Sequence, residues 1–278
     1  MKNKFIILLI LLLFHGKALA EIKIVASINP IASIVSMLVG DAAKVTAIDI
    51  ADGCPHHYHA KPSDLEQVAN ATMVIYIDEN FDGFISKMLE NSHAIKLRIS
   101  DLEALDFQGA DDKVNWHFWL DLDNVMKFSQ LLAEELAVFF PELKPVISKN
   151  LFKSMEQLAE LKVAKDKVIK ETKKIVLFND SLEHFFQGYS NVSRMYHNSN
   201  VSLKYIWQIH SKLNDDPSQC IVLDLTQDTA LYQKFTNPIV QLDSENWHVD
   251  TTLGIEKSQH FYYKYREMIN ELKKCTIH

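Results

Sequence analysis

The feature that most constrains the fold of this chain is a long helical pattern near its middle. Apolar residues recur at helical spacing from Ile147 to Val168, and neither glycine nor proline interrupts the segment before Lys174. The pattern predicts one long helix within residues 142–173, with roughly seven turns in its periodic segment. A helix of that length is typical of a spine that joins two lobes. A coiled coil is the weaker alternative, because the apolar spacing is not sustained in heptads.

Strand-like and helical patterns alternate on both sides of this segment. Strands are predicted over 22–26, 44–49, 73–77, 95–99, 174–178, 220–224 and 238–242. Helices are predicted over 30–39, from Pro62 onward, and over 81–89, 124–140, 180–187, 201–213 and 258–274. Because this alternation is typical of parallel sheets, we expect an α/β fold. Its two βα lobes would be 21–141 and 174–278, joined by the helix over 142–173.

Residues 1–20 have the pattern of an export signal rather than of a folded segment. Lys2 and Lys4 precede an unbroken apolar run over 5–14, and 18–20 supplies the small residues of a cleavage site. The run is shorter than the about 20 residues with which a helix crosses a bilayer. We therefore expect a signal peptide over 1–20 and an exported, soluble chain that begins at Glu21. An uncleaved anchor is the alternative.

Composition excludes two classes of partner. Asp and Glu number 36 against 29 Lys and Arg, a net charge of −7, whereas a nucleic-acid-binding protein needs a basic face. Only 7 of the 278 residues are glycine, and no glycine-rich phosphate loop is present. Neither nucleic-acid binding nor nucleotide binding is therefore expected.

Three cysteines occur, Cys54, Cys220 and Cys275. An exported chain meets an oxidising compartment, where a disulfide can form. Since Cys220 and Cys275 both lie in the last quarter of the chain, we expect them to pair and Cys54 to remain free beside the histidines. The alternatives are that all three stay reduced, or that Cys54 is a metal ligand.

Side chains that bind transition metals follow strands at four places, two in each half of the chain. The places are His56 with His57 and His59; His117 within 116–120; Asn179 and Asp180 with Glu183 and His184; and Asp243 within 241–244. Ligands of open α/β sheets bind beyond the carboxyl ends of the strands. One side chain from each place, facing a cleft between two lobes, would give the four-coordinate site that zinc prefers.

The same places carry a family resemblance. Its motifs are 25–30; Pro55-His56-x-Tyr58 followed by Lys61-Pro62-Ser63-Asp64; His117-Phe118-Trp119-Leu120; the long helix; Leu242-Asp243; and the cysteine pair. In these motifs the chain resembles the metal-specific substrate-binding proteins of bacterial ABC importers, particularly the zinc-uptake type. The resemblance implies two βα lobes joined by one long helix, with a metal in the cleft held by His56, His117 and Asp243.

The resemblance also implies a function. The chain would be a periplasmic solute-binding protein, and not an enzyme. It would capture zinc, with manganese or another divalent metal less favoured. It would deliver the ion to an ABC permease in the inner membrane. A monomer is expected.

The third ligand departs from the family pattern. Zinc members resemble Phe-His-Asp here and manganese members place a glutamate, whereas this chain reads Phe178-Asn179-Asp180. A carboxamide oxygen is a poorer zinc ligand than an imidazole. The site then keeps three protein ligands and water, uses Asn179, or recruits His184. Asn179 also supports a second hypothesis, a degraded metal site in an adhesin or partner-binding protein.

Other interpretations remain open at the level of the sequence. A zinc hydrolase also uses three protein ligands and an open water position, but no His-Glu-x-x-His helix is present. His117 could be a buried, hydrogen-bonded core residue, and Asp243 could cap a turn. The rivals for the role of Asp243 are Glu245, His248 and Asp250.

Overall fold

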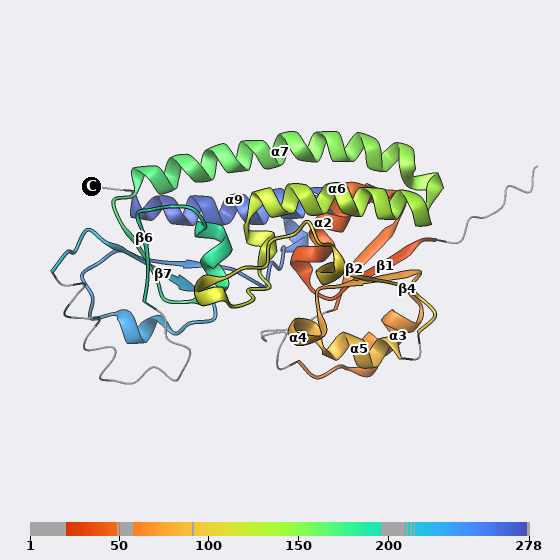
Figure 1. The fold of residues 1–278 in the computed structure, drawn as a ribbon, viewed down its shortest axis with the longest axis horizontal. Helices are drawn as coiled ribbons and strands as arrows, with labels where there is room; N and C mark the ends of the chain where they lie inside the picture. Colours follow the sequence, from red (N-terminus) through yellow and green to blue (C-terminus); the bar gives the residue numbers. More distant parts are fainter. Residues whose placement is uncertain are drawn as a thin grey trace, which may run out of the picture.

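Two parallel sheets and one long helix define the architecture (Figure 1). The computed structural model describes residues 21–48, 50, 58–90, 92–195, 209, 211, 213 and 215–276. Within these ranges, no helix is both long and apolar enough to cross a membrane. The predicted signal peptide lies outside the described residues. The expected two-lobe α/β fold is confirmed.

The first lobe contains a four-stranded sheet in the order β2-β1-β3-β4, and all of its pairings are parallel. The strands are β1 (Lys23–Ala26), β2 (Lys44–Ala47), β3 (Met73–Tyr76) and β4 (Ile95–Arg98). Its helices are α2 (Asn29–Val39), α3 (Pro62–Ala69), α4 (Glu79–Asp82) and α5 (Phe84–Leu89). The single helix predicted over 81–89 is wrong, because Gly83, a residue of low helix propensity, separates α4 from α5.

The second lobe repeats the arrangement with the order β6-β5-β7-β8, again wholly parallel. Its strands are β5 (Ile175–Leu177), β6 (Val192–Arg194), β7 (Cys220–Asp224) and β8 (Ile239–Leu242). The sequence patterns did not predict β6, which has only three residues and ends in an exposed arginine. The helix expected over 180–187 is instead the 3₁₀ helix η7 (Asp180–Phe186). Most of the helix predicted over 201–213 lies outside the described residues.

Three further helices lie along the two lobes (Figure 1). They are α6 (Leu122–Phe139), α7 (Lys144–Glu171) and α9 (His260–Leu272). The spine helix α7 has 28 residues and packs against α2, α6 and α9. In Figure 1 it runs along the top of the molecule above both sheets. The predicted long helix is therefore confirmed.

Short 3₁₀ helices complete the described chain. They are η1 (Gly40–Ala42), η3 (Ile99–Asp101), η4 (Ala110–Asp112), η5 (Phe118–Leu120), η6 (Pro141–Leu143), η8 (Thr229–Tyr232), η9 (Thr251–Leu253), η10 (Lys257–Gln259) and η11 (Lys273–Cys275). The main hydrophobic core is continuous between the lobes, because one cluster of buried residues includes both Ile24 of β1 and Ile175 of β5. The two lobes therefore share one hydrophobic core.

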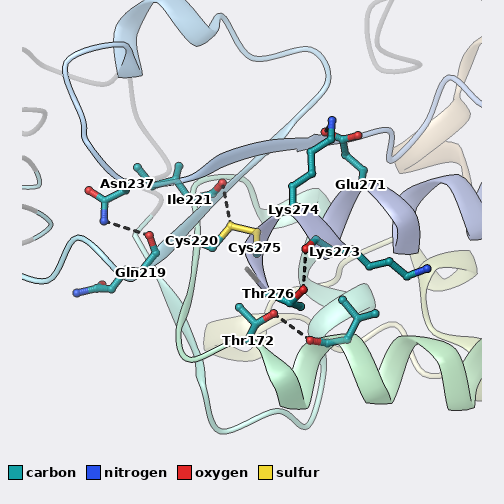
Figure 2. Close-up of a disulfide and its surroundings, with 11 residues drawn as sticks. Thr172, Gln219, Cys220, Ile221, Asn237, Glu271, Lys273, Lys274, Cys275 and Thr276 are labelled. Atoms are coloured by element: carbon teal, nitrogen blue, oxygen red, sulfur yellow. Dashed lines mark hydrogen bonds and ion pairs between the residues drawn. A yellow bond between two sulfur atoms is a disulfide. The ribbon is translucent and has the colours of Figure 1, made fainter. Parts of the chain in front are cut away.

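A disulfide joins Cys220, at the start of β7, to Cys275, at the end of η11 (Figure 2). The two Cα atoms are 5.5 Å apart, within the usual range for a disulfide. The expected pairing is thus confirmed. Cys54 lies outside the described residues.

Candidate metal centre

The predicted ligands divide between described and undescribed segments. His56 and His57 lie outside the described residues. His117 immediately precedes η5, Asn179 stands between β5 and η7, and Asp243 follows β8. The expectation that His117 follows a strand is wrong, because the chain before it forms only an isolated bridge between Gln108 and Val114.

His117 is held between a neighbour in sequence and a residue of the second lobe. Its Nδ1 lies 2.8 Å from Asn115 Oδ1, and its Nε2 lies 2.7 Å from Glu245 Oε1. The side chains of His117 and Glu245 are 12% and 16% exposed. The rings of Phe81 and Trp119 lie 5.6 Å and 5.2 Å from the imidazole, centroid to centroid. The imidazole therefore has aromatic neighbours, and its Nε2 faces a carboxylate.

Asn115 orients this imidazole. Its Nδ2 donates to the carbonyl of Asp180 at 2.8 Å and lies 3.2 Å from Glu183 Oε2, so its Oδ1 must be the atom that faces His117. A carboxamide oxygen only accepts, and Nδ1 of His117 must therefore carry the proton. Histidines that bind a metal through one nitrogen commonly donate the other N–H to such an oxygen. Sequence reasoning missed Asn115, which no motif marks.

His184 is buried and forms hydrogen bonds near Asn115. The side chain is 1% exposed; its Nδ1 lies 3.1 Å from Gln187 Oε1 and its Nε2 lies 3.0 Å from the carbonyl oxygen of Asn115. To act as a ligand it would have to give up at least one of these contacts and leave its buried position. The alternative in which His184 replaces the missing third histidine is therefore contrary to its packing.

Asn179 caps the helix that follows it. Its Oδ1 accepts the backbone N–H of Ser181 at 2.8 Å, which satisfies one free donor at the start of η7. The side chain stands beyond the carboxyl end of β5, where the resemblance places the third ligand. The same oxygen retains a second lone pair, with which it can accept another hydrogen bond or bind a metal ion.

Asp243 organises a turn. Its two carboxylate oxygens accept the backbone N–H groups of Asn246 and Trp247 at 2.8 Å and 3.0 Å. Lys264 Nζ lies 3.5 Å from Asp243 Oδ2, and both side chains are largely buried. Asp243 therefore caps a turn, which was one of the alternatives left open by the sequence.

This turn is also attached to the first lobe. Trp119 Nε1 donates to the carbonyl of Ser244 at 2.8 Å, and Asn29 Nδ2 donates to the carbonyl of Asn246 at 2.9 Å. Glu245 stands between these two anchored residues. The attachment explains how a side chain of the second lobe comes to face His117.

The described residues supply only part of a metal site. No three His, Cys, Asp or Glu side chains among them are grouped so that they could hold an ion. They supply the oriented imidazole of His117, the carboxylate of Glu245 in contact with it, and Asp243, which lies two positions before Glu245. An imidazole nitrogen and a carboxylate oxygen are both good donors for divalent transition metals.

Comparison with known proteins places the chain in a family. The model of the periplasmic component A of the zinc-uptake complex matches residues 24–275. An uncharacterised protein of Rickettsia prowazekii (strain Madrid E) is 37% identical over 271 residues, which cover 96% of this chain and 88% of that protein.

Two streptococcal lipoproteins are more distant relatives. The iron ABC transporter substrate-binding lipoprotein MtsA of Streptococcus pyogenes serotype M1 is 27% identical over 213 residues, covering 72% of this chain and 66% of the relative. The manganese ABC transporter substrate-binding lipoprotein ScaA of Streptococcus gordonii is 27% identical over 215 residues, with the same shares covered.

Solved structures show the same fold. A crystal structure of ZnuA superposes with a TM-score of 0.73 at 18% identity, covering 91% of this chain and 99% of that chain. Zinc-bound AdcA of Streptococcus pneumoniae gives a TM-score of 0.72 at 17% identity, covering 91% of this chain and 58% of that chain. The chain therefore belongs to the family of periplasmic zinc-uptake components, the metal-binding substrate-binding proteins of ABC importers.

Proposed function

We propose that this protein captures zinc in the periplasm and delivers it to the permease of an ABC importer in the inner membrane. Membership of the family makes it a metal-binding substrate-binding protein. The finer assignment, to zinc and to this compartment, rests on the site and on the export signal expected over residues 1–20. No chemical reaction is catalysed, and the protein acts by binding and release as a monomer.

The main support for the proposal is the tautomer and orientation of His117. Asn115 fixes its tautomer, and Nε2 faces a carboxylate of the other lobe. A core histidine would have both nitrogens satisfied by neutral groups of its own surroundings, as His184 has. His117 has instead an oriented nitrogen that is directed between the lobes.

The ligand set proposed from the resemblance is His56, His117 and Asp243. His117 supplies a nitrogen that needs no reorientation, and Asp243 supplies negative charge. Asn179 occupies the position of the third ligand, where a carboxamide oxygen or a water molecule bound to it replaces imidazole. Such a set still offers two imidazoles, which nitrogen-preferring metals bind well.

Zinc is proposed over manganese and iron because of these imidazoles. Affinity at nitrogen sites rises from manganese through iron toward zinc. The matching family model is named for zinc uptake, and the neighbour AdcA holds zinc in its solved structure. Because two relatives are named for iron and manganese, the experiment must compare zinc with these two ions.

Isothermal titration calorimetry on metal-free protein tests the proposal. We expect one zinc ion to bind per chain, more tightly than Mn²⁺ or Fe²⁺ under anaerobic conditions. The variant His117→Ala should weaken zinc binding at least tenfold, a loss of about 1.4 kcal/mol. His93→Ala is the matched control, because His93 is exposed and lies just before the amino end of β4, whereas the proposed ligands follow the carboxyl ends of strands or precede η5.

Three results would contradict the proposal. Absence of one-to-one metal binding by the wild-type protein would remove the proposed function. Binding that His117→Ala leaves unchanged would place the metal elsewhere on the molecule. Tighter binding of Mn²⁺ than of Zn²⁺ would retain metal capture and overturn the assignment to zinc.

A further inference from the structure

A carboxylate outside the family ligand set faces Nε2 of His117. Glu245 Oε1 lies 2.7 Å from His117 Nε2, although the two residues are 128 positions apart in the chain. Both side chains are largely buried, so the contact is not a loose surface pair. The turn that carries Glu245 is attached on both sides to the first lobe, through Ser244 and Asn246.

The tautomer of His117 makes this contact informative. Because Nδ1 carries a proton toward Asn115 Oδ1, neutral His117 presents a lone pair at Nε2. An ionised carboxylate presents only lone pairs as well. Two acceptors at 2.7 Å repel each other unless a cation lies between them. A proton satisfies this arrangement, and so does a metal ion bound to both.

The spacing also suits a metal. Zinc binds nitrogen and oxygen ligands at about 2.0–2.2 Å, so two ligands of one tetrahedral ion lie about 3.3–3.6 Å apart. The observed 2.7 Å between Nε2 and Oε1 requires only a small separation of the two side chains. No rotation of the imidazole is needed, because Asn115 already directs it.

Asp243 is less free than Glu245 to serve a cation. Both of its carboxylate oxygens accept backbone N–H groups, and the ammonium of Lys264 lies 3.5 Å away. Hydrogen bonds to backbone N–H groups reduce the charge that remains for an ion, and a nearby ammonium repels one. Among the described residues, the Glu245 carboxylate contacts the imidazole of His117.

We infer that Glu245 is a ligand of the captured metal, bound to the same ion as His117 Nε2. In this chain Glu245 supplies the strong donor that Asn179 lacks, and Asp243 shapes the turn that presents it. This inference rests on the proposed function. With Glu245 in place of a third histidine, the site has one more oxygen ligand and one more negative charge than a three-histidine site.

The variant Glu245→Gln tests the inference, because glutamine has the same shape and can donate its amide N–H to His117 Nε2. We expect zinc affinity to fall at least tenfold in calorimetric titration. The visible absorption spectrum of the Co²⁺-loaded protein should also change, because a ligand has been lost. Glu267→Gln is the matched control: Glu267 lies 3.1 Å from Lys264 and is 45% exposed. It should leave both the affinity and the spectrum unchanged.

The outcomes separate this inference from the proposed function. If wild-type protein binds no metal, both are overturned. If it binds one ion and Glu245→Gln binds equally well, the proposed function holds and Glu245 is not a ligand. Weaker binding with an unchanged Co²⁺ spectrum would make Glu245 a residue that positions His117, which also overturns the inference.

A second variant distinguishes the loss of a metal ligand from misfolding. Glu245→Asp keeps the charge but withdraws the carboxylate by one methylene. We expect it to bind zinc more weakly than wild type and to give a Co²⁺ spectrum different from that of both other proteins. The melting temperature of each metal-free variant should match that of the wild type. Affinity and spectrum identical to those of wild type would count against direct ligation.

Discussion

At the scale of single residues, the most unusual group is a lysine inside the core. Lys165 of α7 is 5% exposed, and its Nζ donates to the carbonyl of Phe185 at 3.2 Å. The rings of Phe185, Tyr189 and Tyr265 lie 5.2–6.0 Å from the ammonium. Burial lowers the pKa of Lys165 to about 8, although the carboxylates of α6 and α7 oppose the shift. The ammonium is therefore retained at neutral pH at a cost in stability.

This cost gives a pH-dependent prediction. Because the folded protein binds the Lys165 proton less tightly than the unfolded chain, the free energy of unfolding rises between about pH 8 and 10.5. We expect Lys165→Met to be more stable than wild type by about 1–3 kcal/mol at pH 7. The difference should narrow by pH 9.5. Urea unfolding at both pH values measures it.

A matched control lies two positions further along α7. Lys167 is 74% exposed, and Lys167→Met should change stability little at either pH. If Lys165→Met proved less stable than wild type at pH 7, the contacts of the ammonium with the rings and the carbonyl would outweigh its desolvation.

At the scale of elements, the disulfide attaches the last helices to the second sheet. Cys220 begins β7, next to β5 and β8, and Cys275 ends η11, directly after α9. Figure 2 shows the bond between the strand and the end of the helix. Since α9 also packs against the spine helix α7, the disulfide limits separation of the second sheet from the spine.

Removal of the disulfide should lower stability markedly. The cross-link spans 55 positions, for which chain entropy gives about 4 kcal/mol of stabilisation. We expect the double variant Cys220→Ala/Cys275→Ala to lose roughly 2–4 kcal/mol in guanidinium unfolding. Reduced wild-type protein should show the same loss, and Cys54→Ala should show none. Equal stability of the double variant and oxidised wild type would mean that the bond adds nothing in solution.

At the scale of the whole molecule, the two lobes are one packed body. A single cluster of buried residues includes the inner faces of both sheets and parts of α6, α7 and α9. Buried hydrogen bonds cross between distant segments, as from Tyr265 Oη to the carbonyl of Leu120 at 2.6 Å. Large hinge motion would have to break this core. We therefore expect metal release to need only small movements near the turn that carries Glu245.

Thermal unfolding should therefore be a single cooperative transition. Tyr265→Phe leaves the buried Leu120 carbonyl without its donor and should cost about 1–3 kcal/mol, while the transition remains single. Differential scanning calorimetry checks both points through the ratio of calorimetric to van't Hoff enthalpy. Tyr262→Phe is the control, since the hydroxyl of Tyr262 contacts exposed Arg266. Two separate transitions would contradict the shared core.

Much of the fold was predictable from periodicity. The strands over 22–26, 73–77 and 220–224 are confirmed within a residue at each end, and the long helix is confirmed as α7. Periodicity failed where segments are short. The three residues of β6 are too few to show a pattern. Glu183 and His184 of the 3₁₀ helix η7 contact Asn115, 68 and 69 positions away in the chain, which local periodicity does not reveal.

The site was less predictable than the fold. The sequence by itself determined that imidazoles and carboxylates lie beside βα units, that a spine helix separates the two halves, and that two cysteines could pair. Only the tertiary structure decided that Asn115 orients His117 and that Glu245 faces it. The physical reason is distance along the chain. A contact across 128 positions leaves no periodic trace, because the packing of two lobes on α7, rather than any local preference, brings its atoms together.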